Sequence, residues 1–414
     1  MKVSAATAKY RFFSLAVTFW FFVALESVLI WNPFEKVIRV LAFLGMAAAS
    51  LLVFGTSNKG FRKRSYTIFL FASLFILWLT YALSESWSMV FSYFVKFVPL
   101  LLVLFWPADI LNEGYKYIRV GVLVFAVGGA IVSALTLAGL ISHIPHIVLP
   151  PQETLHERLG YEYYVYGFIP TLHDPLSVQS ARTCGMMKEP GHFAIILGFI
   201  YLIDRFREEK ISLWIILAGI LTFSSNFFIM VAITELRYVF NKRYFAKFLK
   251  YTVLATAALT TVFLLLPSGI RDQIYYLFIE RNLADVFEAL KSSSSLSEGL
   301  DMRANVNSVF IFDHISTEEF LFGGVEFDSS LSLADYRGLI LRVGLVGMIL
   351  SFLTIFSTIK VKKTSLQISL LLIYILILAH RSWMLQSPYI YFLSFMAVMI
   401  YSYRSMERER VLIK

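Results

Sequence analysis

The sequence predicts an all-α polytopic membrane protein with about twelve transmembrane helices and two large loops on one side of the membrane. Three observations support this fold class: an apolar composition, a series of apolar runs near the length of a membrane span, and an uneven distribution of basic residues. Of the 414 residues, 58% are hydrophobic and 16% are charged, whereas a soluble domain has about 25% charged residues. The composition excludes a soluble globular enzyme and indicates a single integral membrane domain over residues 1–414.

Apolar runs bounded by charged residues, proline or glycine mark the expected helices. A membrane span needs about 20 mostly apolar residues, so runs near that length are read as spans. The expected spans are 11–31, 37–56, 66–84, 89–106, 119–141, 190–203, 211–223, 225–240, 251–267, 338–359, 366–380 and 388–403. Two long stretches remain outside the membrane, 142–189 and 268–337, and we expect both to be external, periplasmic loops.

Basic residues orient the chain. An even number of spans places both termini on the same side of the membrane, and most of the 37 lysines and arginines fall in the segments on that side. The opposite side has fewer, although it holds both long loops. The positive-inside rule therefore predicts cytoplasmic N- and C-termini. The formal charge of +9 is then a topology signal, and no nucleic-acid partner is expected.

Three consecutive spans, 190–203, 211–223 and 225–240, are unusually short, and only Ser224 separates the last two. Membrane proteins often build sites at interrupted spans, because the freed backbone groups need a wet or protein-lined cavity. One tilted helix through the last two segments is the alternative. It would reverse the parity of the spans, and the basic segment 241–250 argues against it.

Several charged residues lie at membrane depth, where each costs about 2.5 to 3.5 kcal/mol on insertion scales. Glu26 and Lys96 lie inside apolar runs, and we expect them either to pair with each other or to mark a site. Arg342 lies roughly one helical turn deeper than Arg337, so the two are positioned to face one outward cavity. Snorkelling of Arg342 to the membrane surface is the alternative.

The densest polar cluster closes the first long loop, just before the span at 190–203. Pro190 suits the first turn of that helix, where its missing N–H is no loss, and the acidic Glu189 also suits a helix start. A helix start does not explain why Arg182, Lys188 and His192 gather at the same membrane surface. Cations near a helix N-terminus form an anion site, and for a lipid-linked substrate the anion is a phosphate or diphosphate.

The second long loop and the last external turn repeat this pattern. Arg303 and His314 lie within the loop, and Asp335 lies where the chain re-enters the membrane. Gly323–Gly324 allows a tight turn or a close approach of the backbone to a ligand. Arg381 lies in the last external turn. An ordinary solvated loop is the alternative for His314 and the neighbouring acids.

The aromatic run Tyr161–Tyr166 in the first loop is a candidate face for stacking sugars. Tyrosine and tryptophan also gather at membrane interfaces for reasons unrelated to ligands, and such a belt is the alternative explanation.

The cluster around Glu189 resembles a signature of the Wzy-type O-antigen and exopolysaccharide polymerases and of the related O-antigen ligases. The matching residues are Arg182, Gly185, Glu189–Pro190 and Phe193–Ala194. Further on, Leu221–Ser225 is similar to an apolar-Thr-x-Ser segment of that family, although the arginine that often follows the serine is replaced here.

A third match covers Arg303, Phe322–Gly324 and Tyr336–Gly347, which is similar to the family's Arg, Phe-Gly-x-Gly and Gly-Leu-Ile-Gly run. Two departures stand out. Ligases typically carry a histidine near the position where this chain has Ser332 and Asp335, which favours a polymerase over a ligase. Arg342 stands where relatives often have an acid, so the charge arrangement of the family does not transfer.

The resemblance implies a GT-C-like glycosyltransferase in the bacterial inner membrane. Its substrates would be undecaprenyl-diphosphate-linked oligosaccharides, polymerised on the periplasmic face into O-antigen or a related surface polysaccharide with undecaprenyl diphosphate as the leaving group. A chain-length-regulating co-polymerase is the expected membrane partner. An O-antigen ligase, or a flippase or transporter of lipid-linked sugars, is the alternative.

The implied chemistry assigns roles to the polar residues. Arginine forks bind phosphate oxygens bidentately and stabilise charge that builds on a departing diphosphate. The expected substrate-binding residues are Arg182, Lys188, Arg303, Arg337, Arg342, His314 and Arg381. A general base must accept the proton of the attacking hydroxyl; Glu189 is the first candidate, followed by His192, His314 and Asp335. No Asp-x-Asp pair occurs, so we expect catalysis without a metal or other cofactor.

Overall fold

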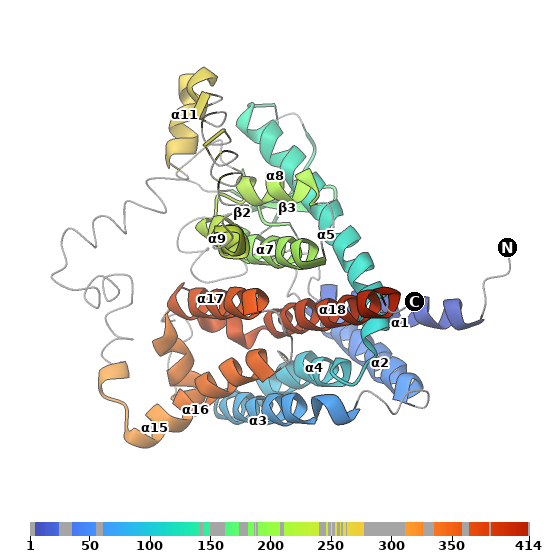
Figure 1. Ribbon diagram of the computed structural model, residues 1–414. Coiled ribbons are helices and arrows are strands. Elements are labelled where there is room, and N and C mark those ends of the chain that lie inside the picture. Colours follow the sequence, from blue (N-terminus) through green and yellow to red (C-terminus); the bar gives the residue numbers. More distant parts are fainter. Residues whose placement is uncertain are drawn as a thin grey trace. The chain divides into compact units, whose positions relative to one another are not determined.

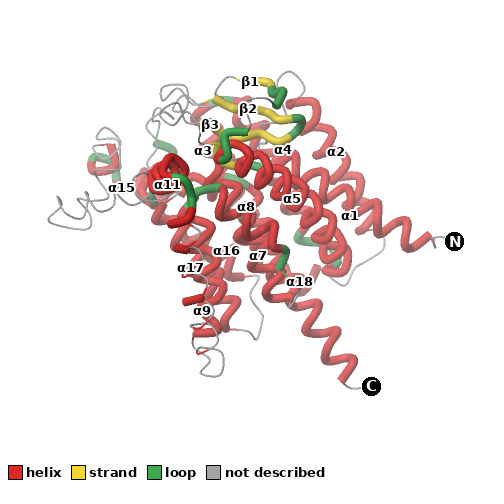
Figure 2. The backbone as a smooth tube through the Cα atoms, turned by 90° about the horizontal axis from the view of Figure 1, so that it is seen from above, coloured by secondary structure: helices red, strands yellow, loops and turns green. Residues whose placement is uncertain are grey.

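The computed structural model describes most of the chain. The described residues are 5–24, 35–54, 61–140, 144–149, 162–173, 181–185, 187, 189–207, 211–239, 246, 250, 253–254, 257, 260–261, 263–276, 311–325, 335–357, 364–380 and 382–412. Helices account for most of these residues, and one small antiparallel sheet lies in the first long loop (Figures 1 and 2).

The chain divides into two compact units, Met1–Gly121 with Asp301–Lys414, and Val122–Leu300. The first unit contains α1 (Ala5–Ala24), α2 (Glu35–Phe54), α3 (Phe61–Glu85), α4 (Trp87–Val103), α15 (Thr317–Phe322), α16 (Tyr336–Ser357), α17 (Thr364–His380), the 3-10 helix η4 (Ser382–Gln386) and α18 (Pro388–Leu412). Helix α5 (Ala108–Leu137) begins in the first unit and ends in the second. The single membrane domain over 1–414 stays a prediction.

The second unit holds the sheet and the short helices. Its strands are β1 (Ile147–Leu149), β2 (Glu162–Tyr166), β3 (Ile169–His173) and β4 (Ala181–Thr183). Its helices are α7 (Pro190–Arg207), α8 (Leu213–Leu221), α9 (Ser225–Val239) and α11 (Ser268–Tyr275).

The helical part of the predicted fold class is confirmed. Described helices overlap every expected span except 251–267; there, only 253–254, 257, 260–261 and 263–267 are described, and all of these but 266 and 267 are helical. In the described part of the chain, three helices are long and apolar enough to cross a membrane, namely Tyr66–Glu85, Ala108–Thr136 and Tyr336–Ser357. The structure therefore supports a helical membrane protein. The count of about twelve spans stays a prediction.

Aromatic side chains fill the core of the first unit. The ring of Phe71 in α3 lies 5.9 Å from that of Phe97 in α4 and 5.7 Å from that of Tyr391 in α18, between centroids. Trp78 stacks on Tyr93 with centroids 5.7 Å apart. Each such pair contributes about 0.5 to 1.5 kcal/mol beyond the area it buries. Many of the large aromatic residues therefore hold the helices together, and others are exposed on the surface.

The sheet in the first loop is a feature that the all-α prediction missed. Its strands pair antiparallel in the order β1-β2-β3-β4, and Tyr166 pairs with Ile169 across the tight turn at Gly167 and Phe168. Gly167 has a φ of 65°, which a residue without Cβ adopts readily. Aromatic and β-branched residues in 162–166 favour a strand, and this pattern was present in the sequence.

Three stacked rings cross the sheet. Tyr164 on β2 lies between His146, which comes just before β1, and His173 on β3. The centroid of its ring is 4.7 Å from that of His146 and 3.9 Å from that of His173. Both faces of the Tyr164 ring are therefore covered, so this tyrosine offers no open face to a sugar. The pKa of His173 is lowered from 6.5 to about 4, mainly because the ring is buried and to a smaller extent because His146 is nearby. Burial also raises the pKa of Tyr166 to about 12.

The lowered pKa of His173 makes the sheet sensitive to acid. The unfolded loop takes up a proton near pH 6.5, whereas the folded sheet resists protonation until about pH 4. The stability contributed by neutral His173 is therefore fully present above pH 6.5 and is lost as the pH falls towards 4, by at most about 3 kcal/mol. Hydrogen-exchange protection of residues 162–173, corrected for intrinsic rates, should fall over this interval.

The variant His173→Phe keeps a stacked ring and removes the titrating group, so its protection should not fall between pH 6.5 and 4. The exposed His314→Gln variant serves as a control and should behave as the unmodified chain. An acid-sensitive sheet in His173→Phe would refute the assignment.

Candidate functional site

Arg182 is buried on β4, where it is only 7% exposed. The strand pairing of Arg182 with Leu172 on β3 fixes its backbone. Its guanidinium donates from Nε to the carbonyl of Thr222 at 3.1 Å and from Nη2 to that of Phe223 at 3.3 Å. Two charge-assisted bonds in a buried position fix the plane of the guanidinium.

The two carbonyls that Arg182 binds lie at a break between α8 and α9. Helix α8 ends at Leu221, and Phe223 takes a φ of 48°, a left-handed conformation that costs a residue with a side chain about 1 to 2 kcal/mol. A helix end leaves carbonyls without intrahelical partners. Arg182 supplies the missing donors. The interpretation as two short helices is therefore confirmed over the alternative of one tilted helix.

Glu189 and His192 form an acid–base pair at the start of α7. Helix α7 begins at Pro190, as predicted, and the carbonyl of Glu189 accepts from the backbone N–H of His192 at 3.1 Å. The carboxylate Oε2 of Glu189 lies 3.6 Å from Nε2 of His192, and the two side chains are 15% and 6% exposed. The sequence-predicted base and its neighbour thus share one enclosed position. Lys188 lies outside the described residues.

Gly185, which lies in the motif from Arg182 to Ala194, occupies a tight turn before α7. It has a φ of 57°, and a Cβ at this position would overlap the ring of Phe193. The turn before α7 therefore requires glycine where Phe193 packs against it. The neighbouring Cys184 donates to the carbonyl of Pro170 at 3.2 Å, and burial raises the pKa of its thiol to about 12. This cysteine is a packing residue.

Asp335 and Arg337 form a second cluster, which lies in the first unit. Nε of Arg337 donates to both carboxylate oxygens of Asp335 at 3.1 Å, and Nη2 lies 2.7 Å from Oδ2. The backbone N–H of Arg337 also donates to Oδ1 at 3.0 Å. Both side chains are buried. Asp335 therefore holds the start of α16 and orients Arg337, which favours a positioning role over that of a general base.

Arg342 is buried further along α16 and is 7% exposed. In the orientation that satisfies its neighbours, the amide oxygen of Gln386 accepts from Nε of Arg342 at 2.9 Å and also from Nη1. The amide nitrogen then donates to the hydroxyl of Tyr93 at 3.1 Å. Tyr81 of α3 hydrogen-bonds Arg342 as well. These contacts replace the snorkelling alternative with an arginine anchored between helices.

Helix α16 is interrupted directly after Arg342, a break that the sequence did not predict. Gly344 has φ 69° and ψ 176°, which divides the expected span at 338–359. The carbonyls of Leu341 and Arg342 accept from the backbone N–H groups of Val325 and Gly324, both at 3.1 Å. A Cβ on Gly344 would overlap the backbone of Leu321 and Phe322. At Gly323–Gly324, where the sequence predicts a tight turn or a close approach to a ligand, the backbone instead lies close to that of α16.

The segment that approaches α16 is shaped by a short helix, α15. Ser316 Oγ accepts from the backbone N–H of Glu319 at 3.1 Å, and the carboxylate of Glu319 accepts from the N–H of Ser316 at 2.7 Å. This reciprocal capping box starts α15, and these hydrogen bonds lower the pKa of Glu319. His314, in the turn before it, is exposed.

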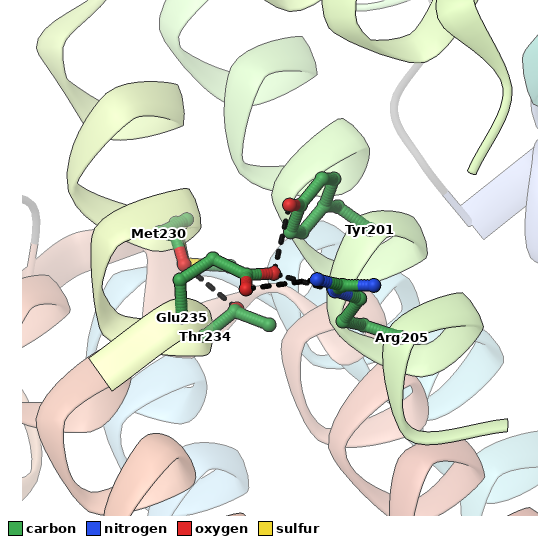
Figure 3. Close-up of polar contacts among 5 residues, drawn as sticks. All are labelled: Tyr201, Arg205, Met230, Thr234 and Glu235. Atoms are coloured by element: carbon green, nitrogen blue, oxygen red, sulfur yellow. Dashed lines mark hydrogen bonds and ion pairs between the residues drawn. The ribbon is translucent and has the colours of Figure 1, made fainter. Parts of the chain in front are cut away.

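Sequence reasoning missed a partly buried ion pair between α7 and α9 (Figure 3). Glu235 accepts from Nε and Nη2 of Arg205 at 2.7 and 3.1 Å and from the hydroxyl of Tyr201 at 2.8 Å. Glu235 is 7% exposed. The signal was available, because an acid inside the apolar run 225–240 requires a partner. This pair fastens α7, which carries His192, to α9.

The structure places the predicted residues in two groups. Arg182, Glu189 and His192 lie in the second unit, and Asp335, Arg337 and Arg342 in the first. Arg303 and Arg381 lie outside the described residues. In the described part of the chain, no group of three His, Cys, Asp or Glu side chains is placed to hold a metal ion.

No protein-family model, curated protein or solved structure matches the chain. The helices are compatible with a helical membrane protein, and the two clusters contain buried, oriented arginines.

The break in α16 requires glycine at position 344. Gly344→Ala should lower the free energy of unfolding by at least about 2 kcal/mol, because the new Cβ meets backbone atoms and the φ is strained. Gly45→Ala in α2 is the matched control, since its Cβ meets nothing within 4 Å. Thermal unfolding in detergent compares the two. Equal stability of the two variants would contradict the interpretation.

The Arg205–Glu235 pair should show a coupling of about 1 to 2 kcal/mol in a double-mutant cycle of Arg205→Gln and Glu235→Gln, because the carboxylate is buried and the arginine only partly so. The exposed Lys116–Glu113 pair is the control, with an expected coupling below about 0.5 kcal/mol. Unfolding in detergent is the measurement. A coupling no larger than the control would show that the pair does not fasten α7 to α9.

Proposed function

We propose that this chain is a membrane glycosyltransferase that polymerises undecaprenyl-diphosphate-linked oligosaccharide units into O-antigen or a related surface polysaccharide. The reaction takes place on the periplasmic face of the bacterial inner membrane, with both termini cytoplasmic. The growing glycan moves from one lipid carrier to the terminal sugar of another lipid-linked unit, and undecaprenyl diphosphate leaves. The resemblance of 182–347 to the Wzy-type polymerases supports this proposal.

One structural observation carries it furthest: three arginines are buried among apolar helices, and neighbouring groups fix each of them. Arg182, Arg337 and Arg342 are each 7% exposed. Burial of a cation among apolar helices costs free energy, so a buried arginine is a candidate for binding a charged substrate. Both substrates of the proposed reaction carry a diphosphate, so oriented guanidinium groups match their chemistry.

Arg182 lies in the same unit as Glu189 and His192 and is the arginine assigned to the leaving group. Cleavage of the anomeric C–O bond passes through an oxocarbenium-like state, and the bonding electrons move onto the leaving diphosphate. Guanidinium groups that are already in place stabilise this new charge more than the ground state. Hydrogen bonds from Arg182 to Thr222 and Phe223 remove the cost of reorganising it during the reaction.

The Glu189–His192 pair supplies the acid–base step. The acceptor hydroxyl attacks the anomeric carbon and gives its proton to the carboxylate of Glu189, whose Oε2 lies 3.6 Å from Nε2 of His192. His314 is exposed, and Asp335 is engaged with Arg337, so both rank behind Glu189 as the base. Lys188, Arg303 and Arg381 are proposed as further diphosphate ligands, and no metal is assigned to any step.

Two other functions fit parts of the chain. An O-antigen ligase would use the same donor, but the Asp335–Arg337 ion pair stands where ligases carry their histidine. A flippase of lipid-linked sugars would also need buried cations. It would need no acid–base pair, and Glu189–His192 therefore favours an enzyme.

The decisive experiment incubates the purified full chain with a synthetic undecaprenyl-diphosphate repeat unit and separates the products on a gel. A ladder of longer glycans is the expected result. A single new band with a lipid A core acceptor would indicate a ligase, and movement of the unit across vesicles without a new bond would indicate a flippase.

Glu189→Gln should lower the polymerisation rate by about 10² or more, because the base is lost while the shape of the side chain is kept. The rate of the unmodified chain should fall at low pH as the base is protonated, and the residual rate of the variant should lack this fall. Arg11→Gln, an exposed cation, is the control. An unchanged rate in Glu189→Gln would remove Glu189 from the mechanism.

A further inference from the structure

The phenol of Tyr81 connects the buried Arg342 to an acid at the surface. Tyr81 is on α3 and is 5% exposed, and its side chain hydrogen-bonds both Arg342 of α16 and Glu85. Glu85 is the last residue of α3 and is exposed. The proposed reaction assigns no role to Tyr81 or to Glu85.

The chemistry of the three groups determines the direction of these hydrogen bonds. A guanidinium only donates, a carboxylate only accepts, and a phenol has one proton. The hydroxyl of Tyr81 therefore accepts from Arg342 and donates to Glu85. Because Glu85 holds the phenol proton, the lone pairs of the phenol oxygen remain directed at the guanidinium, and bonds in such a chain strengthen one another.

Packing holds both ends of the contact between Tyr81 and Arg342 in place. The ring of Tyr81 meets that of the buried Trp78 edge-on, with centroids 6.2 Å apart. The amide oxygen of Gln386 accepts from Nε of the guanidinium at 2.9 Å. A phenol of α3 and an amide of η4 thus orient the same guanidinium.

Antiparallel packing of α3 and α16 places Glu85 beside the first turns of α16. At one end of this helix pair, Oγ of Ser357 donates to Oγ1 of Thr67 at 3.0 Å, and towards the other end Tyr81 meets Arg342. Residues that follow Tyr81 on α3 therefore lie beside residues that precede Arg342 on α16. Glu85 is about one turn beyond Tyr81, so it lies at the level of the half-helix that carries the buried arginines.

We propose that Tyr81 and Glu85 are positioning residues that hold the guanidinium of Arg342 in the orientation that binds the diphosphate of the lipid-linked substrate. Glu85 acts only through Tyr81: its carboxylate fixes the phenol proton, and the phenol oxygen fixes the guanidinium. The proposal rests on the substrate-binding role proposed for Arg342. Neither residue needs to touch the substrate, so both act on how tightly it binds.

Equilibrium binding of undecaprenyl diphosphate to the purified full chain in detergent tests this role. Tyr81→Phe removes only the hydroxyl and should raise the Kd about tenfold, the loss expected for one hydrogen bond to a charged group. Glu85→Gln should raise it about threefold, and Glu85→Asp, which keeps the carboxylate, should restore most of the binding. The controls are Tyr66→Phe and Glu318→Gln, an exposed phenol and an exposed acid of the same unit, and both should bind as the unmodified chain.

A double variant separates positioning from a general loss of structure. Because Glu85 acts through Tyr81, Tyr81→Phe/Glu85→Gln should bind no more weakly than Tyr81→Phe alone. In the polymerisation assay, Tyr81→Phe and Glu85→Gln should raise the KM for the lipid-linked unit while kcat stays within about twofold, since binding is affected and the chemical step is not. A structural defect would instead lower the fraction of active protein and therefore kcat.

Multiplicative effects of the two substitutions on the Kd, or an unchanged Kd in Tyr81→Phe, would overturn the proposal, as would a fall in kcat at constant KM. The expected pattern of Kd values without a ladder from the unmodified chain would support the positioning role and refute the polymerase. A ladder whose KM neither variant changes would refute the positioning role alone. Failure of the unmodified chain to bind undecaprenyl diphosphate would overturn this proposal together with the substrate-binding role of Arg342.

Discussion

Broken helices inside an apolar chain impose one constraint on the rest of the structure: every carbonyl that leaves the helical ladder needs a donor. The chain meets this need twice in different ways. Arg182 donates to Thr222 and Phe223 where α8 ends, and the backbone of Gly324 and Val325 donates to Arg342 and Leu341 where α16 breaks. An unsatisfied group in a lipid-like interior costs several kcal/mol. These donors are therefore conditions for the fold.

The constraint also explains why the candidate site residues are rigid. Arg182 completes a helix end, and Arg342 hydrogen-bonds Gln386 immediately before a helix break. Movement of the Arg182 side chain would expose the carbonyls of Thr222 and Phe223, and movement of the Arg342 side chain would break its bonds to Gln386. A rigid arginine suits the stabilisation of a diphosphate, because no reorganisation is needed when charge develops. Fold and proposed chemistry thus depend on the same contacts.

Sequence reasoning found the features that follow from local composition. The start of α7 at Pro190 and the break at Ser224 both depend on residues adjacent in the chain. It missed features that join distant segments. The Arg205–Glu235 pair spans 30 positions, and the break at Gly344 is visible only when residues 321–325 pack against it. The sheet was missed because its aromatic run also suits a membrane interface.

The interruption at Gly344 has an electrostatic consequence. It leaves Tyr336–Val343 as a short helix of its own, with Asp335 at its N-terminal end and Arg342 in its last turn. Aligned peptide units give such a helix a positive start and a negative end, each equivalent to roughly half an elementary charge. The acid and the arginine thus lie at the ends that favour them. This half-helix compensates its own charges, and the buried Arg342 needs no carboxylate within its own turn.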